Sequence, residues 1–277
     1  MIYKIEDNKI IILDKTQFNP KHILECGQVF RFGKDENNNY FVISKDKKAT
    51  IIETETNYQI LSSDPEYFVE YFDLNTDYNE IKNQLQNHKI LSEMIPYGYG
   101  IRILKGDPHE MIFSYIISQN NNIKRIQKII ESLCKIGSLT NEGFYAFPTI
   151  SQLSSKPLEF YQTLSAGSRD KFLKQTADYL SNINLEEIKS KTTDEIYDIL
   201  SSLQGVGPKV ASCILLFGFH KMDKFPVDTW LEQVYYNHFS NNKLSRPDIQ
   251  KYFESIFKEN SGIAQQYMFY YERERKN

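Results

Sequence analysis

One stretch of this 277-residue chain constrains its fold more than any other, and it lies between residues 194 and 230. Apolar residues recur at helical spacing from Ile196 to Leu203, which predicts an amphipathic helix. Gly205-Val206-Gly207 follows and permits a tight turn, and Pro208 suits the first position of the next helix. An almost wholly apolar run comes next. The sequence therefore predicts two helices joined by a hairpin turn, over about 195–217.

The glycine turn predicts a contact with a phosphate backbone. The backbone N–H groups of Gly205, Val206 and Gly207, together with the positive end of the second helix dipole, suit a phosphate oxygen. A contact of this kind does not depend on base sequence. The turn by itself fits an ordinary helical hairpin at least as well. Lys209 and Asp228, 19 residues apart in apolar surroundings, favour the first interpretation.

The turn combined with Lys209 and Asp228 resembles the helix–hairpin–helix DNA glycosylases of base-excision repair. The segments described below narrow the resemblance to a bacterial 8-oxoguanine DNA glycosylase. It implies that Lys209 attacks C1′ of the damaged nucleotide, forms a Schiff base and cleaves the strand by β-elimination. Asp228 is implied to stabilise the developing positive charge and to cap the next helix. Burial at a helix start is expected to lower the pKa of Lys209. The simpler interpretation is a phosphate-binding lysine and a capping aspartate.

Five residues are implied to form the pocket for an extruded base. Gly27 begins the stretch GQVFRF and resembles the glycine whose carbonyl accepts N7–H of oxidised guanine, where guanine itself presents an acceptor. Taken alone, this glycine fits a β-bulge. Gln265 and Phe269 are four residues apart and share a helical face. The resemblance gives Gln265 the Watson–Crick edge of the lesion and Phe269 one ring face. It places Cys213 on the other face and assigns Phe217 to the same pocket.

Three consecutive asparagines interrupt an apolar helix at 120–122, and asparagine carries the donors and acceptors that base edges require. A polar corner between helices is the simpler interpretation. The segment SQNNNIKRI resembles the family's SSNNNI-x-RI, which implies that Asn120 and Arg125 contact the cytosine left behind. Asn121 is implied to help distort the duplex. The predicted DNA contacts are Asn120, Asn121, Arg125, Arg169, Gly205, Val206, Gly207 and Trp230.

Three positions depart from the family pattern. Ser168 precedes Arg169 where the family has an aromatic wedge beside the extruded base, so the wedge is missing or is supplied by another residue. Ser212 stands where an aspartate often precedes the cysteine, and Trp230 stands where a histidine often follows the catalytic aspartate. These changes suggest looser recognition of the opposite base, whereas the retained asparagine and arginines imply that cytosine is still preferred.

The first 75 residues predict antiparallel β structure. Short β-branched or aromatic runs alternate with polar loops, as in a meander, and they lie at 9–13, 29–32, 40–43 and 50–54. From about residue 65 the apolar pattern is helical. We therefore expect an α+β protein. A small antiparallel β domain over 1–75, which the resemblance makes TBP-like, precedes an all-helical glycosylase region over 76–277. The last helix, 262–274, is expected to close the lesion pocket.

The charge and the apolar runs set limits on location and partners. The formal net charge of −3 is unusual for a DNA-binding protein, so basic side chains are expected to gather on one face. No apolar run is long enough to span a bilayer, and the first residues show no signal-peptide pattern. We therefore expect a cytoplasmic protein of a bacterium or archaeon that joins the nucleoid while it acts.

No cofactor is expected to be required. The three cysteines are far apart, which predicts neither a disulfide framework nor the four-cysteine iron–sulfur cluster of other superfamily members. The resemblance implies one cation site, in which main-chain carbonyls of Ser201, Leu203 and Val206 hold a monovalent or divalent ion that assists phosphate binding.

The predicted partner is double-stranded DNA containing 8-oxoguanine opposite cytosine, bound by a monomer and without a membrane. The predicted activity is that of a bifunctional DNA glycosylase and AP lyase. Two alternatives stay open: a glycosylase for another oxidised or alkylated base, and a non-catalytic module that binds damaged DNA. A purely structural helical protein fits the acidic charge but leaves the Lys–Asp pair and the asparagine triplet unexplained.

Overall fold

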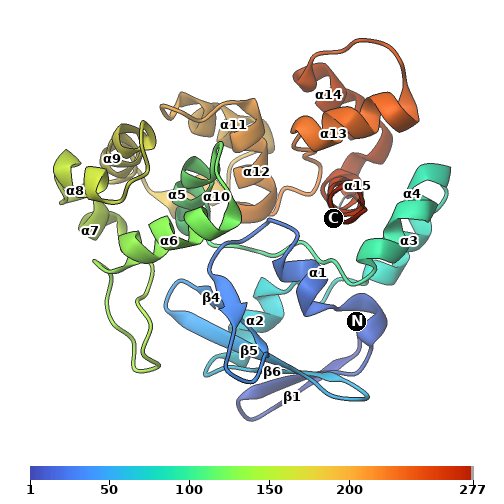
Figure 1. Cartoon of the computed structure of the whole chain (residues 1–277), viewed down its shortest axis with the longest axis horizontal. Helices are drawn as coiled ribbons and strands as arrows, with labels where there is room; N and C mark the ends of the chain where they lie inside the picture. Colours follow the sequence, from blue (N-terminus) through green and yellow to red (C-terminus); the bar gives the residue numbers. More distant parts are fainter. Residues whose placement is uncertain (276–277) are drawn as a thin grey trace.

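A computed structural model describes residues 1–275 of the chain, and Figure 1 shows a sheet at one end with helices above it. The sheet has six strands in the order β1-β2-β6-β5-β4-β3, and every neighbouring pair is antiparallel. The strands are β1 Tyr3–Glu6, β2 Lys9–Ile12, β3 Phe32–Lys34, β4 Tyr40–Ser44, β5 Lys47–Glu53 and β6 Tyr58–Leu61. The predicted α+β class with an N-terminal antiparallel sheet is confirmed.

Alternation of apolar and polar side chains explains which face of the sheet is covered. In β5 the side chains of Ala49 and Ile51 are buried and their neighbours along the strand are at least partly exposed. In β6, Tyr58 and Ile60 are buried. Because successive side chains of a strand point to opposite faces, these residues form one apolar face. Helices α1 (Pro20–Leu24) and α2 (Pro65–Tyr71) pack against the sheet.

The prediction of a strand over 29–32 is wrong. Val29 and Phe30 are buried in a loop, and β3 begins only at Phe32. Tertiary contacts fix this loop: the hydroxyl of Tyr115 donates a hydrogen bond to the carbonyl of Gln28, over 3.1 Å. The sequence pattern also missed α1 and a short 3₁₀ helix, η1 (Lys15–Gln17), whereas α2 lies where a helical pattern was predicted from about residue 65. The domain boundary at residue 75 stays a prediction.

Helices dominate the rest of the chain. They are α3 Tyr78–Leu85, α4 Lys89–Met94, η2 Ile95–Gly98, α5 Pro108–Ser118, α6 Ile123–Cys134, α7 Ile150–Ser154, α8 Leu158–Thr163, α9 Arg169–Leu180, α10 Leu185–Lys189, α11 Thr193–Ser202, α12 Pro208–Gly218, α13 Thr229–Val234, η3 Tyr235–Phe239, α14 Arg246–Phe257, η4 Lys258–Asn260 and α15 Ser261–Glu274. A single β-bridge joins Leu139 to Tyr145 in the loop after α6. Asp107 caps α5, because its side chain accepts a hydrogen bond from the N–H of Glu110.

Two helix contacts organise this body. Helix α12, buried from Val210 to Gly218, packs against α5 and α11. Helix α15 packs against α13 and α14 and also against α4 and η2, which come much earlier in the chain (Figure 1). An added Cβ at Gly262 would lie 2.3 Å from Leu216 Cδ1, so α15 approaches α12 closely at its first turn. The two helices predicted to carry the site are therefore in contact.

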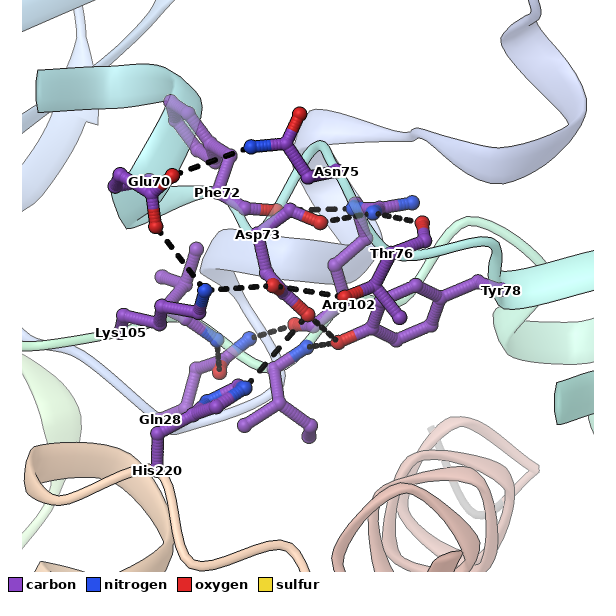
Figure 2. Close-up of polar contacts among 12 residues, drawn as sticks. Gln28, Glu70, Phe72, Asp73, Asn75, Thr76, Tyr78, Arg102, Lys105 and His220 are labelled. Carbon is purple, nitrogen blue, oxygen red and sulfur yellow. Dashed lines mark hydrogen bonds and ion pairs between the residues drawn. The ribbon is translucent and has the colours of Figure 1, made fainter. Parts of the chain in front are cut away.

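A buried arginine ties the sheet end of the molecule to the helices. Arg102 is 0% exposed, and its guanidinium donates to the carbonyls of Phe72, Asp73 and Thr76 (Figure 2). It also donates to the carbonyl of Gln17. Its Cζ lies 4.1 Å from the ring centroid of Tyr78, whose hydroxyl in turn donates to the Asp73 carboxylate. Burial lowers the pKa of Arg102, while the Tyr78 and Asp73 charges raise it. The charge is retained because donors and acceptors are matched.

The backbone of Arg102 also fastens the loop that carries Gly27. The Gln28 side chain donates to the carbonyls of Ile23 and Arg102, over 2.9 and 2.8 Å, and accepts from the N–H of Leu104 over 2.9 Å. Figure 2 shows Gln28 and Arg102 in one continuous set of polar contacts. These hydrogen bonds therefore fix the loop 27–30 to the backbone at Ile23, Arg102 and Leu104.

The substitution Arg102→Met should lower the free energy of unfolding by about 3 kcal/mol or more, because four buried carbonyls lose a charged donor. Urea unfolding followed by circular dichroism measures this difference. Lys251→Gln, at an exposed position of α14, serves as the control and should change it by less than about 0.5 kcal/mol. Equal stability of the two variants would contradict the role given to Arg102.

Candidate active site

Lys209 lies at the start of α12 and is exposed to solvent. Its ammonium group hydrogen-bonds the thiol of Cys213, one helical turn further on. Its Nζ also lies 5.9 Å from the ring centroid of Tyr115 on α5. Pro208 occupies the first position of the helix and Gly207 its N-cap, so the lysine emerges directly after the glycine turn. The hairpin therefore presents one amine on an otherwise apolar helix.

The prediction that the pKa of Lys209 is lowered is wrong for the free chain. The Cys213 sulfur, which hydrogen-bonds the amine, raises this pKa, as does the Asp228 carboxylate, and together they outweigh the desolvation that lowers it. Burial raises the pKa of the Cys213 thiol, which is only 4% exposed. Lys209 is therefore an ammonium ion at neutral pH, and any attack by its nitrogen must be preceded by loss of a proton.

Asp228 caps α13, as predicted. Its Oδ1 accepts hydrogen bonds from the N–H groups of Trp230 and Leu231, over 2.9 and 3.0 Å. The same carboxylate acts electrostatically on Lys209. Capping and charge interaction with the lysine are therefore not exclusive roles: the cap holds the carboxylate in place, and its negative charge faces the amine.

Gly27 and Phe269 lie next to each other, although they are far apart in the sequence. Gly27 has a positive φ of 86°, and an added Cβ would lie 3.7 Å from Phe269 Cε1. Phe269 is partly exposed on α15, and Arg273 Cζ lies 5.5 Å from its ring centroid. Gln265, one turn before Phe269, is buried and accepts a hydrogen bond from Gln266 Nε2 over 2.7 Å. Phe269, one of the two residues predicted to hold the lesion, thus meets the Gly27 loop, and Gln265 lies one helical turn before it on α15.

Tyr115 joins this group to α12, and the sequence interpretation did not include it. Its hydroxyl contacts the carbonyls of Gln28 and Gly27, and its ring stacks on Phe217 with centroids 5.7 Å apart and planes 12° apart. Phe217 itself is buried on α12, one turn beyond Cys213. A buried tyrosine hydroxyl needs a hydrogen-bond partner, so a lone tyrosine within an apolar helix was the available signal.

The hairpin turn has the geometry that its glycines predict. Gly205 has a φ of 84°, and the N–H of Val206 donates to the carbonyl of Leu203 over 3.0 Å. Val206 and Leu203 are buried, whereas Gly207 is exposed and has open space where a side chain would be. Ser201, in the last turn of α11, is exposed. The turn therefore leaves the start of α12 open to a ligand.

The asparagine triplet forms the corner between α5 and α6. Asn120 is exposed with a φ of 43°, Asn121 Nδ2 donates to the carbonyl of Ile117 over 3.3 Å, and Asn122 caps α6. The simpler interpretation as a helix corner is therefore confirmed. It leaves the side chain of Asn120 on the surface, where the predicted contact with a base is still open to it.

Arg125 and Arg169 lie near this corner. Arg125 Nη2 donates to the carbonyl of Ser165 over 3.0 Å, and Arg169 Nη1 donates to that of Ala166, also over 3.0 Å. Arg169 Nε reaches the carbonyl of Ile117 over 3.4 Å, which ties α9 to the end of α5. Desolvation and the nearby charge of Arg125 lower the pKa of Arg169. Two like charges are thus held close together beside Asn120.

The three departures from the family pattern have distinct surroundings. Ser168 is exposed and makes no capping bond to α9. Ser212 is fully buried, and its hydroxyl donates to Gln250 on α14 over 3.3 Å. Trp230 is half-buried at the start of α13 and packs against the core. Ser212 therefore contributes to the contact between α12 and α14. Ser168 does not supply the aromatic ring that the family places beside the extruded base.

Two features are absent from residues 1–275. No three histidine, cysteine, aspartate or glutamate side chains in this range are grouped so that they can hold a metal ion. Within the same range no helix is long and apolar enough to cross a membrane.

Comparison with known proteins gives matches along the whole chain. Residues 10–112 match the family model of the 8-oxoguanine DNA glycosylase N-terminal domain. The structure superposes on an 8-oxoguanine glycosylase/lyase of Clostridium acetobutylicum, solved with double-stranded DNA containing cytosine opposite 8-oxoG. The two share 36% sequence identity and a TM-score of 0.92, over 100% of this chain and 99% of the other.

Two further relatives agree with these matches. MBOgg1, solved with a low-affinity DNA ligand, shares 33% identity and a TM-score of 0.93, with 100% of both chains covered. The N-glycosylase/DNA lyase of Saccharomyces cerevisiae is 28% identical over 264 residues, covering 81% of this chain and 69% of the yeast protein.

The two glycines of the hairpin should respond differently to substitution. Gly205→Ala puts a Cβ 2.3 Å from Phe172 Cδ2 at a φ of 84°, so it should cost about 2 kcal/mol of stability through strain and overpacking. Gly207→Ala meets no atom within 4 Å and should keep stability within about 1 kcal/mol.

Gly207→Ala tests most directly whether the open turn binds DNA. Its methyl group stands where a phosphate is predicted to bind, so Gly207→Ala should weaken binding to duplex DNA while the protein unfolds at nearly the wild-type urea concentration. Fluorescence anisotropy with a labelled duplex measures the affinity. Wild-type affinity in a stable Gly207→Ala protein would remove the turn from the DNA interface.

Proposed function

The chain belongs to the 8-oxoguanine DNA glycosylase/lyase family, and on that premise we propose that Lys209 is its nucleophile and Asp228 the carboxylate that assists it. The protein is a bifunctional DNA glycosylase and AP lyase that removes 8-oxoguanine from double-stranded DNA in base-excision repair. The observation that carries the assignment of residues is the grouping of Lys209, Cys213 and Asp228 at the end of the hairpin.

The proposed reaction begins with extrusion of the damaged nucleotide, which costs a few kcal/mol of unstacking and unpairing. Lys209 first loses a proton. Its nitrogen then forms a bond to C1′ as the bond from C1′ to the base breaks, and the base leaves. The negative charge of Asp228 stabilises the positive charge that develops on the sugar. The C1′–O4′ bond then breaks, which opens the sugar ring, and loss of a proton from nitrogen leaves the Schiff base. Removal of the C2′ proton lets the 3′ C–O bond break by β-elimination, with the 3′ phosphate as the leaving group.

Recognition of the lesion is proposed to depend on the Gly27 carbonyl. Oxidised guanine carries a hydrogen on N7, whereas guanine has an acceptor there, so one carbonyl separates the two bases. Gln265 is proposed to bind the Watson–Crick edge, with Phe269 and Cys213 on the two ring faces and Phe217 behind them. This proposal is supported by the contact distance between Gly27 and Phe269 and by the stacking of Phe217 on Tyr115.

The surrounding residues are proposed to hold the duplex. The turn Gly205–Gly207 is proposed to bind a phosphate through backbone N–H groups, and Trp230, two residues after Asp228, is proposed to contact the DNA as well. Asn120, Arg125 and Arg169 contact the unpaired cytosine, while Asn121 helps to bend the DNA. The bonds of Arg125 and Arg169 to nearby carbonyls support this assignment, because they hold both guanidinium groups near Asn120.

We further propose a cation at the hairpin, held by the carbonyls of Ser201, Leu203 and Val206. The last carbonyls of a helix lack intrahelical partners, and α11 ends directly before this turn, which fits an oxygen-ligated ion. Such an ion would strengthen phosphate binding. Action as a monomer, in the compartment that holds the cell's DNA, also remains a proposal.

The nucleophile is tested by borohydride trapping on a duplex with 8-oxoguanine opposite cytosine. The intact protein should give a covalent adduct, and Lys209→Gln should give none, because an amide nitrogen forms no Schiff base. Lys251→Gln controls for loss of a surface charge and should trap as the intact protein does. If the intact protein binds but neither traps nor cuts, the assignment of Lys209 and of this lesion fails.

The opposite base should influence the rate of excision. Single-turnover excision opposite cytosine should exceed that opposite adenine about fivefold or more, since one or two hydrogen bonds from arginine are gained. Arg125→Gln should reduce this ratio without abolishing excision. Equal rates opposite all four bases would contradict the proposed contacts of Arg125 and Arg169 with cytosine.

A further inference from the structure

Tyr115 occupies a central position between the two parts of the site. It lies in the middle of α5 and is 2% exposed. On one side is the loop 27–30 and on the other the helix α12 that carries the nucleophile. Its hydroxyl donates to the carbonyl of Gln28 over 3.1 Å and shares the bond with the carbonyl of Gly27 over 3.4 Å.

The ring of Tyr115 is fixed on several sides. Phe217 stacks on it with centroids 5.7 Å apart, and Phe30 meets it edge-on at the same centroid distance and an angle of 71°. Lys209 Nζ lies 5.9 Å from the ring centroid. Burial raises the pKa of Tyr115, so the phenol keeps its proton and acts as a donor. The direction of the hydroxyl is therefore set by packing.

The carbonyl of Gly27 needs such support because its residue has no side chain to anchor it. A φ of 86° is accessible to glycine at little cost, and glycine also has the greatest freedom to leave it. The Gln28 side chain holds the loop from the Arg102 side, as Figure 2 shows for Gln28 and Arg102. The Tyr115 hydroxyl holds the two successive carbonyls from the α5 side.

A carbonyl oxygen has two lone pairs, so one can accept from Tyr115 while the other accepts from a ligand. A fixed acceptor binds a donor more tightly than a mobile one, since less freedom is lost on binding. Guanine has an acceptor at N7 and forms no hydrogen bond with a carbonyl there, so fixing the carbonyl gives it no binding energy. A mobile carbonyl, in contrast, can turn away from this acceptor. Fixing the carbonyl therefore increases the difference between the two bases.

We propose that the Tyr115 hydroxyl is a positioning group for lesion recognition, which fixes the Gly27 carbonyl and so sets the discrimination of 8-oxoguanine from guanine. The inference rests on the proposed role of Gly27. The inference predicts different effects on the two activities of the protein, base excision and strand cleavage. Base excision depends on the hydroxyl, whereas strand cleavage at an existing abasic site has no base to recognise and does not.

The test compares Tyr115→Phe with the intact protein, since this substitution removes the hydroxyl and keeps the ring beside Lys209 and Phe217. Loss of one hydrogen bond should raise the half-saturating protein concentration for single-turnover excision of 8-oxoguanine about three- to tenfold. The ratio of affinities for duplexes with 8-oxoguanine and guanine should fall by the same factor. Cleavage of an abasic-site duplex should stay within about twofold.

Tyr161→Phe is the matched control. Tyr161 is also fully buried, and its hydroxyl donates to the backbone carbonyl of Leu153 over 2.8 Å, away from the site. This variant should leave the excision and lyase rates, and the affinity ratio, at intact-protein values. A comparable loss of discrimination in both variants would show a general effect of removing a buried hydroxyl and would overturn the proposal.

Two outcomes for Tyr115→Phe itself would also overturn it. In the first, excision and abasic-site cleavage fall together, which places the hydroxyl's effect on Lys209 or on the fold. In the second, neither the half-saturating concentration nor the affinity ratio changes. Retained lyase activity shows that the variant is folded. Failure of the nucleophile assignment is recognised separately, because Lys209→Gln would then still trap on the abasic duplex.

Discussion

The close contact between α5 and α12 is the constraint on which the rest of the site depends. The helices approach so closely that a Cβ at Gly218 would lie 3.1 Å from Met111 Cβ, and the N–H of Gly106 donates to the carbonyl of Phe217 over 3.0 Å. This packing fixes the rotation of α12 about its axis and its distance from α5. A shift of either helix by a fraction of an ångström would move Lys209 relative to Tyr115, because packed interiors have no free volume to absorb it.

The groups around Lys209, the proposed nucleophile, stabilise its charged form and do not lower its pKa. The free protein has a charged Lys209, because the Cys213 sulfur and, to a smaller extent, Asp228 favour the ammonium form. Such an arrangement holds the amine in one place until substrate arrives. The capping bonds of Asp228 fix the carboxylate that does this, so one aspartate stabilises a helix and orients a lysine. An extruded base that covers the amine would increase its desolvation and favour the neutral, nucleophilic form.

Local signals in the sequence were sufficient for much of this architecture. The hairpin turn, its glycine conformation and the caps Asp107 and Asp228 follow from rules that involve a few neighbouring residues. The loop 27–30 was misassigned because Val29 and Phe30 have β propensity, while the bonds of Gln28 to the backbone at Arg102 and Leu104 decide its conformation. Tyr115 and the sign of the Lys209 shift were missed for the same reason. Both depend on groups brought together only by the fold.

A net acidic chain can bind DNA if its contacts do not rely on overall charge. The proposed phosphate contact uses backbone N–H groups and the local dipole at the start of α12, and it needs no lysine. Arg125 and Arg169 are held close together by carbonyls of the loop before α9, and desolvation together with their mutual repulsion lowers the pKa of Arg169. An acceptor-rich base edge placed between them relieves that repulsion. In the proposed complex this stabilisation is therefore gained only where a base has lost its partner, because an intact duplex offers no free base edge.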